Sequence, residues 1–337
     1  MKFILKIIGL LLIVSCVQKE EITLQVLQGN AFGTTYTIQY YSNSDVVIKR
    51  GIDSVINAVN TSVSTYMPES DISKINKGDS AIVVDEIFKD VWEISERVHI
   101  ASGGFFDPTI GVLRNAYGFG DVKPILNLDK KVLDSLRELV GFNKVKINMN
   151  GTIQKKHPMI YFDFNAVAKG YGIDCLGTYL ESKQIENYII ELGGEILAKG
   201  KNVIKDTYWT AGVESLDAEI TEKGKAIIVI ALNNSAMAGS GNYRKFRIDP
   251  VTGKKYVHTI NPLTGLAEQN NMTSAAVIAP TCAVADAFAT ACMAMGSAAA
   301  IEMLKEEGSI EGYLTFLDSD GSAKTYSSPG FKQLVLN

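Results

Sequence analysis

The chain has 337 residues, with 33 lysines and arginines against 37 aspartates and glutamates, which gives a formal net charge of −4. An acidic chain of this kind is not attracted to the phosphates of nucleic acids, so we expect no nucleic-acid partner. Its length would allow about two domains, but no linker rich in proline and serine and no internal repeat lies between residues 30 and 330. We therefore expect one catalytic domain over residues 30–337.

Residues 1–15 predict a secretory signal peptide, which is removed from the mature protein. Lys2 and Lys6 precede an apolar run, residues 7–14, that is too short to span a bilayer as a stable helix. Cys16 follows this run directly, after a small residue, as in the lipobox of bacterial lipoproteins.

The resemblance to a lipobox implies that Cys16 is acylated and becomes the mature N-terminus. Two or three acyl chains on one cysteine anchor a protein stably to a membrane. We therefore expect residues 16–29 to be a lipidated cysteine and a tether. The protein would then be an extracytoplasmic, membrane-anchored lipoprotein, placed most simply on the periplasmic side of the inner membrane. The alternative is a plain signal peptide that ends beside an incidental cysteine.

Hydrophobic periodicity predicts a mixture of helices and strands along the rest of the chain. Residues 33–41 alternate between apolar and polar side chains, as a half-buried strand does. Helical spacing begins at Ile52 and again at Ile87. We further expect helices near 129–140, 166–182 and 282–306, and strands near 144–162, 187–260 and 312–326. These elements do not repeat as βαβ units, so we predict an α+β fold with mixed or antiparallel sheets and flanking helices.

Cysteine and glycine patterns exclude several kinds of site. Apart from Cys16, the cysteines are Cys175, Cys282 and Cys292, all among small or apolar residues. An odd number without regular spacing argues against a disulfide framework and favours buried free thiols. Zinc-ligand spacing, a Ser/His/Asp constellation and the glycine-rich Rossmann and Walker motifs are also missing from the sequence.

A carboxylate and a hydroxyl share one face of a predicted helix towards the end of the chain. Asp286 and Thr290 lie four residues apart in VADAFATACMAMG, which places both side chains on the same helix face. Both are hard oxygen ligands that suit Mg²⁺, which keeps further positions for water and phosphate. The alternative is that the spacing is incidental and that Thr290 bonds back to its own helix.

Lys169 and His258 also lie where side chains can take part in chemistry. The segment IYFDFNAVAKGYG predicts a strand that ends at Asp163 and a helix that begins near Ala166, with Lys169 on its first turns. A lysine at the positive end of a helix is unfavourable unless an anion binds there, although a solvated lysine is the simpler interpretation. His258 lies between a strand and a Pro/Gly turn, where side chains often face a cleft, although single histidines are more often structural.

The order of these motifs along the chain resembles the ApbE family of flavin transferases, which are FAD:protein FMN transferases. The matching segments cover nearly the whole mature chain, and they are AFGTTY (31–36), STYMPESDISKIN (64–76), GGFFDPTIGVL (103–113), DFNAVAKGYGID (163–174), ELGGEI (191–196), SGNYRKF (240–246), HTINPLTG (258–265) and ADAFATACMAMG (285–296). The resemblance implies an ApbE-like, T-fold-like catalytic domain.

Carried over position by position, the resemblance also implies site residues. Asp286, Thr290 and the backbone carbonyl of Ala166 would hold Mg²⁺. Lys169 would contact the pyrophosphate of FAD, and His258 would assist the proton transfer. The other FAD contacts that it implies are Phe32, Tyr66, Phe105, Phe106, Asp107, Asp163 and Ile260.

Three positions depart from the usual pattern of the family. Phe32 stands where the family commonly has methionine, which keeps an apolar contact but changes its shape. Asn165 replaces a glycine, so the backbone near the metal could differ. Gly239 stands where the family has the threonine of a Thr-Ser-Gly run, which removes one hydroxyl.

The resemblance implies an activity: Mg²⁺-dependent transfer of FMN from FAD to a threonine of an acceptor protein, through a phosphoester bond and with release of AMP. The acceptor class that it implies is a subunit of a respiratory redox complex. Two alternatives remain open from the residues alone. One is a Mg²⁺-dependent FAD pyrophosphatase that gives FMN and AMP, and the other is a non-catalytic flavin-binding lipoprotein.

Overall fold

The computed structural model describes residues 22–42, 47–120, 122–125, 128–214, 227–241, 246–248, 253, 255–267 and 270–336. The predicted signal peptide and Cys16 lie outside these ranges. Within them, no helix combines the length and the apolar character that a membrane crossing requires.

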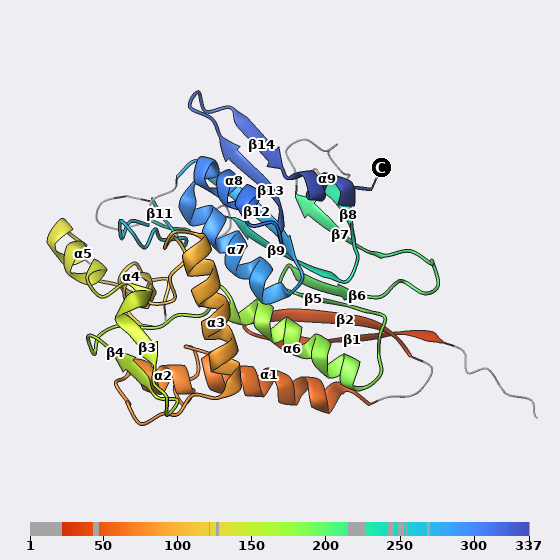
Figure 1. Cartoon of the computed structure of the whole chain (residues 1–337), viewed down its shortest axis with the longest axis horizontal. Coiled ribbons are helices and arrows are strands. Elements are labelled where there is room, and N and C mark those ends of the chain that lie inside the picture. Colours follow the sequence, from red (N-terminus) through yellow and green to blue (C-terminus); the bar gives the residue numbers. More distant parts are fainter. Residues whose placement is uncertain are drawn as a thin grey trace, which may run out of the picture.

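An antiparallel sheet forms the centre of the fold (Figure 1). It has eight strands in the described part of the chain. Its strands, in spatial order, are β1 (Thr23–Ala31), β2 (Thr34–Ser42), β5 (Tyr188–Leu192), β6 (Glu195–Lys199), β9 (Ser235–Gly241), β12 (Met272–Ala279), β13 (Glu311–Leu317) and β14 (Ala323–Ser327). Among the residues that the structure describes, three two-stranded sheets pair β3 (Val145–Ile147) with β4 (Ile153–Lys155), β7 (Trp209–Glu214) with β8 (Ile227–Leu232), and β10 (Phe246–Ile248) with β11 (Lys255–Val257).

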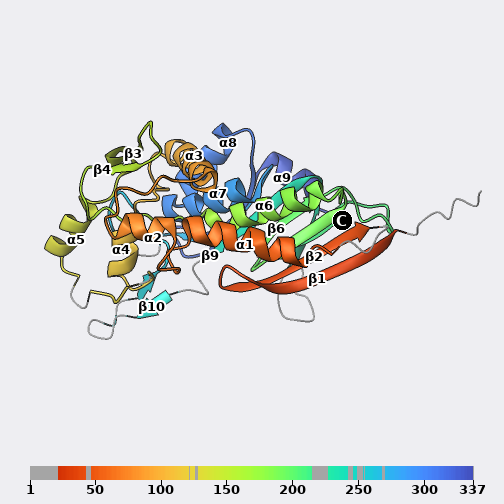
Figure 2. The same cartoon turned by 90° about the horizontal axis from the view of Figure 1, so that it is seen from below.

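Helices cover one face of the large sheet, and in Figure 2 α6, α7 and α8 lie on one side of β1 and β2. The helices are α1 (Lys49–Val63), α2 (Asp71–Asn76), α3 (Glu86–Ala101), α4 (Gly111–Ala116), α5 (Lys130–Arg137), the 3₁₀ helix η1 (Phe142–Lys144), α6 (Ala168–Ser182), α7 (Cys282–Met295), α8 (Ser297–Glu306) and α9 (Pro329–Leu334). The strands β7 and β8 and helix α9 share an apolar core with the opposite face.

The sequence of strand β12, MTSAAVIA, is mostly apolar because both faces of the strand are covered. Successive strand residues point to opposite faces of a sheet. Ala275 and Val277 belong to the core beneath the helices, whereas Ala276 and Ile278 belong to the core beneath β7 and β8. Because both faces are covered, neither set of side chains needs to be polar.

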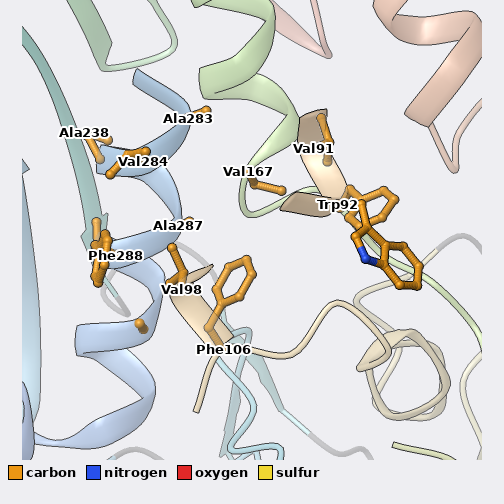
Figure 3. Packing of buried hydrophobic residues seen from close by; sticks show 14 of the residues in the cluster. Val91, Trp92, Val98, Phe106, Val167, Ala238, Ala283, Val284, Ala287 and Phe288 are labelled. Atoms are coloured by element: carbon orange, nitrogen blue, oxygen red, sulfur yellow. The ribbon is translucent and has the colours of Figure 1, made fainter. Parts of the chain in front are cut away.

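Helix α7 is buried on nearly every side, and Thr290 and Met295 are its only residues that are not fully buried. Figure 3 shows Val284 and Phe288 of this helix on the side that faces Ala238 of β9. A helix that is apolar all round belongs in a protein interior. Asp286, a carboxylate in the middle of this helix, therefore lies in a setting that requires a specific partner.

The α+β prediction is confirmed, and each helix expected from periodicity is present with slightly different bounds. The strand expected at 33–41 is β2, with Tyr36, Ile38 and Tyr40 buried. Residues 23–29 differ from the expected tether, because they belong to β1, which pairs with β2 along its full length. Most of β1 is exposed, since it is an edge strand, and this explains why its sequence lacks a clear apolar alternation.

Candidate functional site

One pocket of about 520 Å³ gathers most of the predicted site residues. This volume falls within the range usual for small-molecule sites. The predicted residues that line it are Phe105, Phe106, Asp107, Asp163, Ala166, Lys169, His258, Ile260, Asp286 and Thr290. Phe32 and Tyr66 are not among its lining residues, and Cys16 lies outside the described part of the chain.

The pocket depends on a close approach between helices α6 and α7. A side chain at Gly170 would place its Cβ 2.4 Å from the carbonyl oxygen of Cys282, so only glycine allows this contact. The Gly170 N–H donates to Asp286 Oδ2 at 3.2 Å. The first turn of α6 and the middle of α7 are therefore joined directly at the metal ligands implied by the resemblance.

This contact also frees the backbone carbonyl of Ala166. In a regular helix the N–H of Gly170 would donate to the carbonyl four residues earlier, which is that of Ala166. It donates to Asp286 instead, and within the described residues no backbone hydrogen bond ends at the Ala166 oxygen. Ala166 precedes α6 and lines the pocket.

The donor set fits a hard divalent cation. Asp286 is buried, and burial raises the pKa of its carboxyl, although the Lys169 charge and the Gly170 N–H oppose this rise. Thr290 lies one turn further along α7 and lines the same pocket. A carboxylate, a hydroxyl and a carbonyl suit Mg²⁺, which is usually held by few protein oxygens. Across the described ranges, no group of three or more His, Cys, Asp or Glu side chains could hold a metal.

Lys169 is half-buried in an ion pair and is not a solvated lysine. Its Nζ lies 2.5 Å from Glu195 Oε2, and that carboxylate is 3 % exposed. Burial lowers the pKa of Lys169, but the charges of Asp286 and Glu195 outweigh burial and raise it. The anion that offsets a lysine at this helix terminus is therefore supplied in part by the protein itself.

Asp163 is held by an arginine that the sequence did not single out. Arg114, on α4, donates to Asp163 Oδ2 and also to the Tyr66 hydroxyl at 2.8 Å. The guanidinium carbon lies 5.9 Å from the centre of the Tyr66 ring. Tyr66 is exposed and lies outside the pocket lining, but Arg114 links it to the pocket wall.

The Phe105-Phe106-Asp107 segment is fixed by hydrogen bonds of Asp107 to its own loop and to η1. Asp107 accepts hydrogen bonds from the N–H and hydroxyl of Thr109 at 2.8 and 2.6 Å, and from the Phe142 N–H at 3.0 Å. Phe106 is buried in the main core, whereas Phe105 is half-buried beside the pocket. Asp107 therefore shapes this wall through internal hydrogen bonds.

Phe32 occupies the turn between β1 and β2. Its φ of 50° lies in the left-handed region, which is uncommon for a bulky residue and is found more often at functional sites. Its ring packs so closely on Gly172 of α6 that a Cβ there would lie 2.5 Å from it. Phe32 thus supports the first turns of α6 from outside the pocket.

His258 follows β11, as its sequence setting predicted, and is half-buried in the pocket wall. Ile260, two residues later, lines the same wall and is buried with Leu113 and Tyr117 in a small apolar cluster. The chain after β11 therefore presents a titratable side chain and an apolar one to the same space.

Two departures from the family pattern have little effect on this geometry. Asn165 does not adopt a positive φ, and its N–H donates to Asp163 Oδ1 at 2.8 Å, so no glycine is needed there. Gly239 lines the pocket, and a Cβ added to it would meet nothing within 4 Å. The missing threonine thus leaves open space in the pocket wall.

Asp174 secures the start of α7 from the neighbouring helix. Its carboxylate accepts from the N–H groups of Cys282 and Ala283 at 2.7 and 2.8 Å. Burial raises the pKa of Asp174 to about 7, against the lowering effect of these two hydrogen bonds. It does for α7 what an N-cap side chain normally does.

We expect the Asp174→Ala variant to lose about 2 to 4 kcal/mol of unfolding free energy, because two helix N–H groups lose their partner in a buried place. Urea unfolding followed by circular dichroism measures this loss. The matched control is Asp129→Ala, which removes an exposed N-cap of α5 and should cost only about 1 kcal/mol. Equal losses in the two variants would show that the Asp174 contact contributes no more than an ordinary cap.

Comparison with known proteins gives consistent matches over this whole region. The sequence model of the ApbE family matches residues 32–314. The chain is 32 % identical to a FAD:protein FMN transferase of Haemophilus influenzae, over 97 % of this chain and 96 % of that protein. It is 31 % identical to one from Vibrio cholerae, over 97 % of both chains.

Solved structures show the same fold. The flavin transferase ApbE from Vibrio cholerae superposes with a TM-score of 0.81 at 30 % identity, covering 93 % of this chain and all of that one. The apo form of the flavinyl transferase ApbE from Pseudomonas stutzeri gives a TM-score of 0.81 at 22 % identity, covering 93 % of this chain and 97 % of that one. The second likeness supports the fold alone.

Proposed function

The chain belongs to the ApbE family, and from this membership we propose that it is a FAD:protein FMN transferase that uses Mg²⁺. The observation that carries the proposal is that Lys169, Asp286 and Thr290 line one pocket. Beside them lies the Ala166 carbonyl, which accepts no backbone hydrogen bond from α6. An ammonium group and hard oxygen ligands together suit a pyrophosphate and a divalent cation.

In the proposed reaction, the hydroxyl of an acceptor threonine attacks the phosphorus on the FMN side of the FAD pyrophosphate. The bond from this phosphorus to the bridging oxygen breaks, AMP leaves with that oxygen, and a phosphoester-linked flavin results. Reactions of this kind depend mainly on positioning and charge neutralisation. Lys169 would bind the pyrophosphate and stabilise the negative charge that grows on the departing AMP.

Asp286, Thr290 and the Ala166 carbonyl would hold Mg²⁺, which supplies Lewis-acid stabilisation of the phosphoryl oxygens when it is bound. His258 would accept the proton of the attacking hydroxyl, because it is the histidine in the wall of this pocket. Tyr66, Phe105, Asp163 and Ile260 would contact the flavin and adenosine parts of FAD. Aromatic rings suit the flat groups, and a carboxylate can accept hydrogen bonds from ring or sugar donors.

We further propose that the protein is a lipoprotein anchored through Cys16 and that its acceptor is a membrane respiratory protein. The motif at Cys16 supports the anchor. Fractionation of cells followed by mass analysis of the N-terminal peptide tests it, since an unacylated, freely soluble mature protein would refute the anchor.

The transferase and the two alternatives differ in their products. Incubation of the protein with FAD and Mg²⁺, with and without an acceptor domain, should release AMP rapidly only when the acceptor is present, and EDTA should stop the release. AMP that forms equally fast without an acceptor would instead support a pyrophosphatase. FAD that stays intact under all conditions would support a binding protein.

A further inference from the structure

We propose that Glu195 is a positioning residue, which holds the Lys169 ammonium group in the pocket wall even though its own charge opposes the binding of the substrate phosphates. This inference rests on the proposed function, because it concerns the residue that would bind the FAD pyrophosphate. Glu195 is neither one of the proposed Mg²⁺ ligands nor one of the proposed FAD contacts.

A tight turn delivers Glu195 to the pocket. Strands β5 and β6 are joined by Gly193 and Gly194 alone, and Leu192 pairs with Glu195 across the turn. Both glycines have positive φ, at 61° and 107°, as two-residue hairpin turns of this kind require. A Cβ at Gly193 would lie 2.7 Å from the Thr34 side chain, so the turn also packs tightly on the neighbouring strand.

The period of strand β6 directs Glu195 towards α6. Side chains two residues apart lie on the same face of a strand, and Leu197 packs in the core that α6 shares with the sheet. Glu195 therefore points to the helical side, where it meets Lys169 at 2.5 Å. A carboxylate that is 3 % exposed is rare without such a partner.

The balance of charge in the pocket makes this carboxylate unexpected for a site that binds an anion. Two buried carboxylates, Asp286 and Glu195, line the pocket together with Lys169. Asp286 has a role as a proposed metal ligand, but Glu195 would repel the phosphates. An uncharged side chain at position 195 would favour FAD binding. We therefore infer that the carboxylate contributes by holding the Lys169 ammonium group in position.

Loss of the Glu195 charge should affect FAD binding and turnover differently. In Glu195→Gln, which keeps the shape and removes the charge, we expect FAD to bind as tightly as in the wild type or several-fold tighter. Turnover at saturating FAD should fall about tenfold to a hundredfold, because a misplaced catalytic group costs rate even when binding survives. FAD fluorescence titration and initial rates of AMP release measure the two quantities.

Two further variants act as controls. Glu195→Asp keeps the charge on a shorter side chain and should recover part of the turnover that Glu195→Gln loses. Glu302→Gln removes the carboxylate of an exposed pair with Lys305 on α8 and should change neither quantity. A Glu195→Gln variant that loses affinity and turnover together, or neither, would overturn the proposal. If Glu195→Gln does not fold, the test passes to Glu195→Asp, which must then show reduced turnover at unchanged FAD affinity. Any other result for Glu195→Asp would overturn the proposal.

A double-mutant cycle on FAD affinity separates this proposal from the proposed function. Lys169→Met should cost less affinity in the Glu195→Gln background than in the wild type, since Lys169 is poorly placed there. Additive effects would refute the positioning role. Because the cycle measures binding alone, it still decides the role of Glu195 if the wild type neither labels an acceptor nor releases AMP, an outcome that would refute only the transferase.

Discussion

Replacement of Asp286 by alanine should reduce FMN transfer about 10²- to 10³-fold, which corresponds to about 3 to 4 kcal/mol of transition-state stabilisation. The carboxylate is the only charged member of the proposed Mg²⁺ set, which also contains the Thr290 hydroxyl and the Ala166 carbonyl. The fold should survive: the Gly170 N–H loses its acceptor, but removal of a buried carboxylate offsets this cost, and Lys169 keeps its ion pair with Glu195. Initial rates of AMP release at saturating FAD and Mg²⁺ measure the loss.

Two comparisons make this result specific. Thr290→Val removes a neutral ligand of the same shape and should cost less than Asp286→Ala. Asp206→Ala removes an exposed carboxylate that pairs with Lys201, away from the pocket, and should have no effect. Turnover of Asp286→Ala near the wild-type rate in Mg²⁺ would show that the metal is not held there.

The second large effect is expected at Lys169. Lys169→Met should lower turnover about 10²-fold, because the pyrophosphate loses its ammonium contact. It should also lower the unfolding free energy by up to about 3 kcal/mol, since Glu195 is left as an unpaired buried carboxylate. Rates of AMP release and urea unfolding measure these two losses separately.

The double variant Lys169→Met/Glu195→Gln distinguishes the two effects. It should regain most of the lost stability, because the unpaired charge is gone, but none of the lost turnover. Recovery of turnover together with stability would mean that Lys169 acts only through the fold.

The fold could be predicted largely from local pattern. The alternation in β2 and the helical spacing in α1 and α3 are visible in the sequence because each element has one buried face and one polar face. Strand β1 was not visible, since it lies at the sheet edge with most of its residues exposed. The order of the strands in the sheet could not be predicted either, because it depends on pairings between strands that are far apart in the sequence.

The pocket could be predicted from motifs, but the residues that support it could not. Lys169, Asp286 and Thr290 stand out by type and spacing, and the structure brings them together. Arg114 and Glu195 act on partners that lie far away in sequence, so local periodicity does not reveal them. A signal for Glu195 was nevertheless present, because a charged residue stands at an inward position of a strand directly after a Gly-Gly turn.

The most direct test of the central claim is the intact mass of a purified acceptor domain, which carries its target threonine, after incubation with the protein, FAD and Mg²⁺. We predict that the acceptor gains the mass of one FMN, that one AMP appears for each FMN transferred, and that EDTA or the Asp286→Ala variant prevents both. An acceptor of unchanged mass while FAD is still cleaved, or labelling that persists in EDTA, would contradict Mg²⁺-dependent flavin transfer in this pocket.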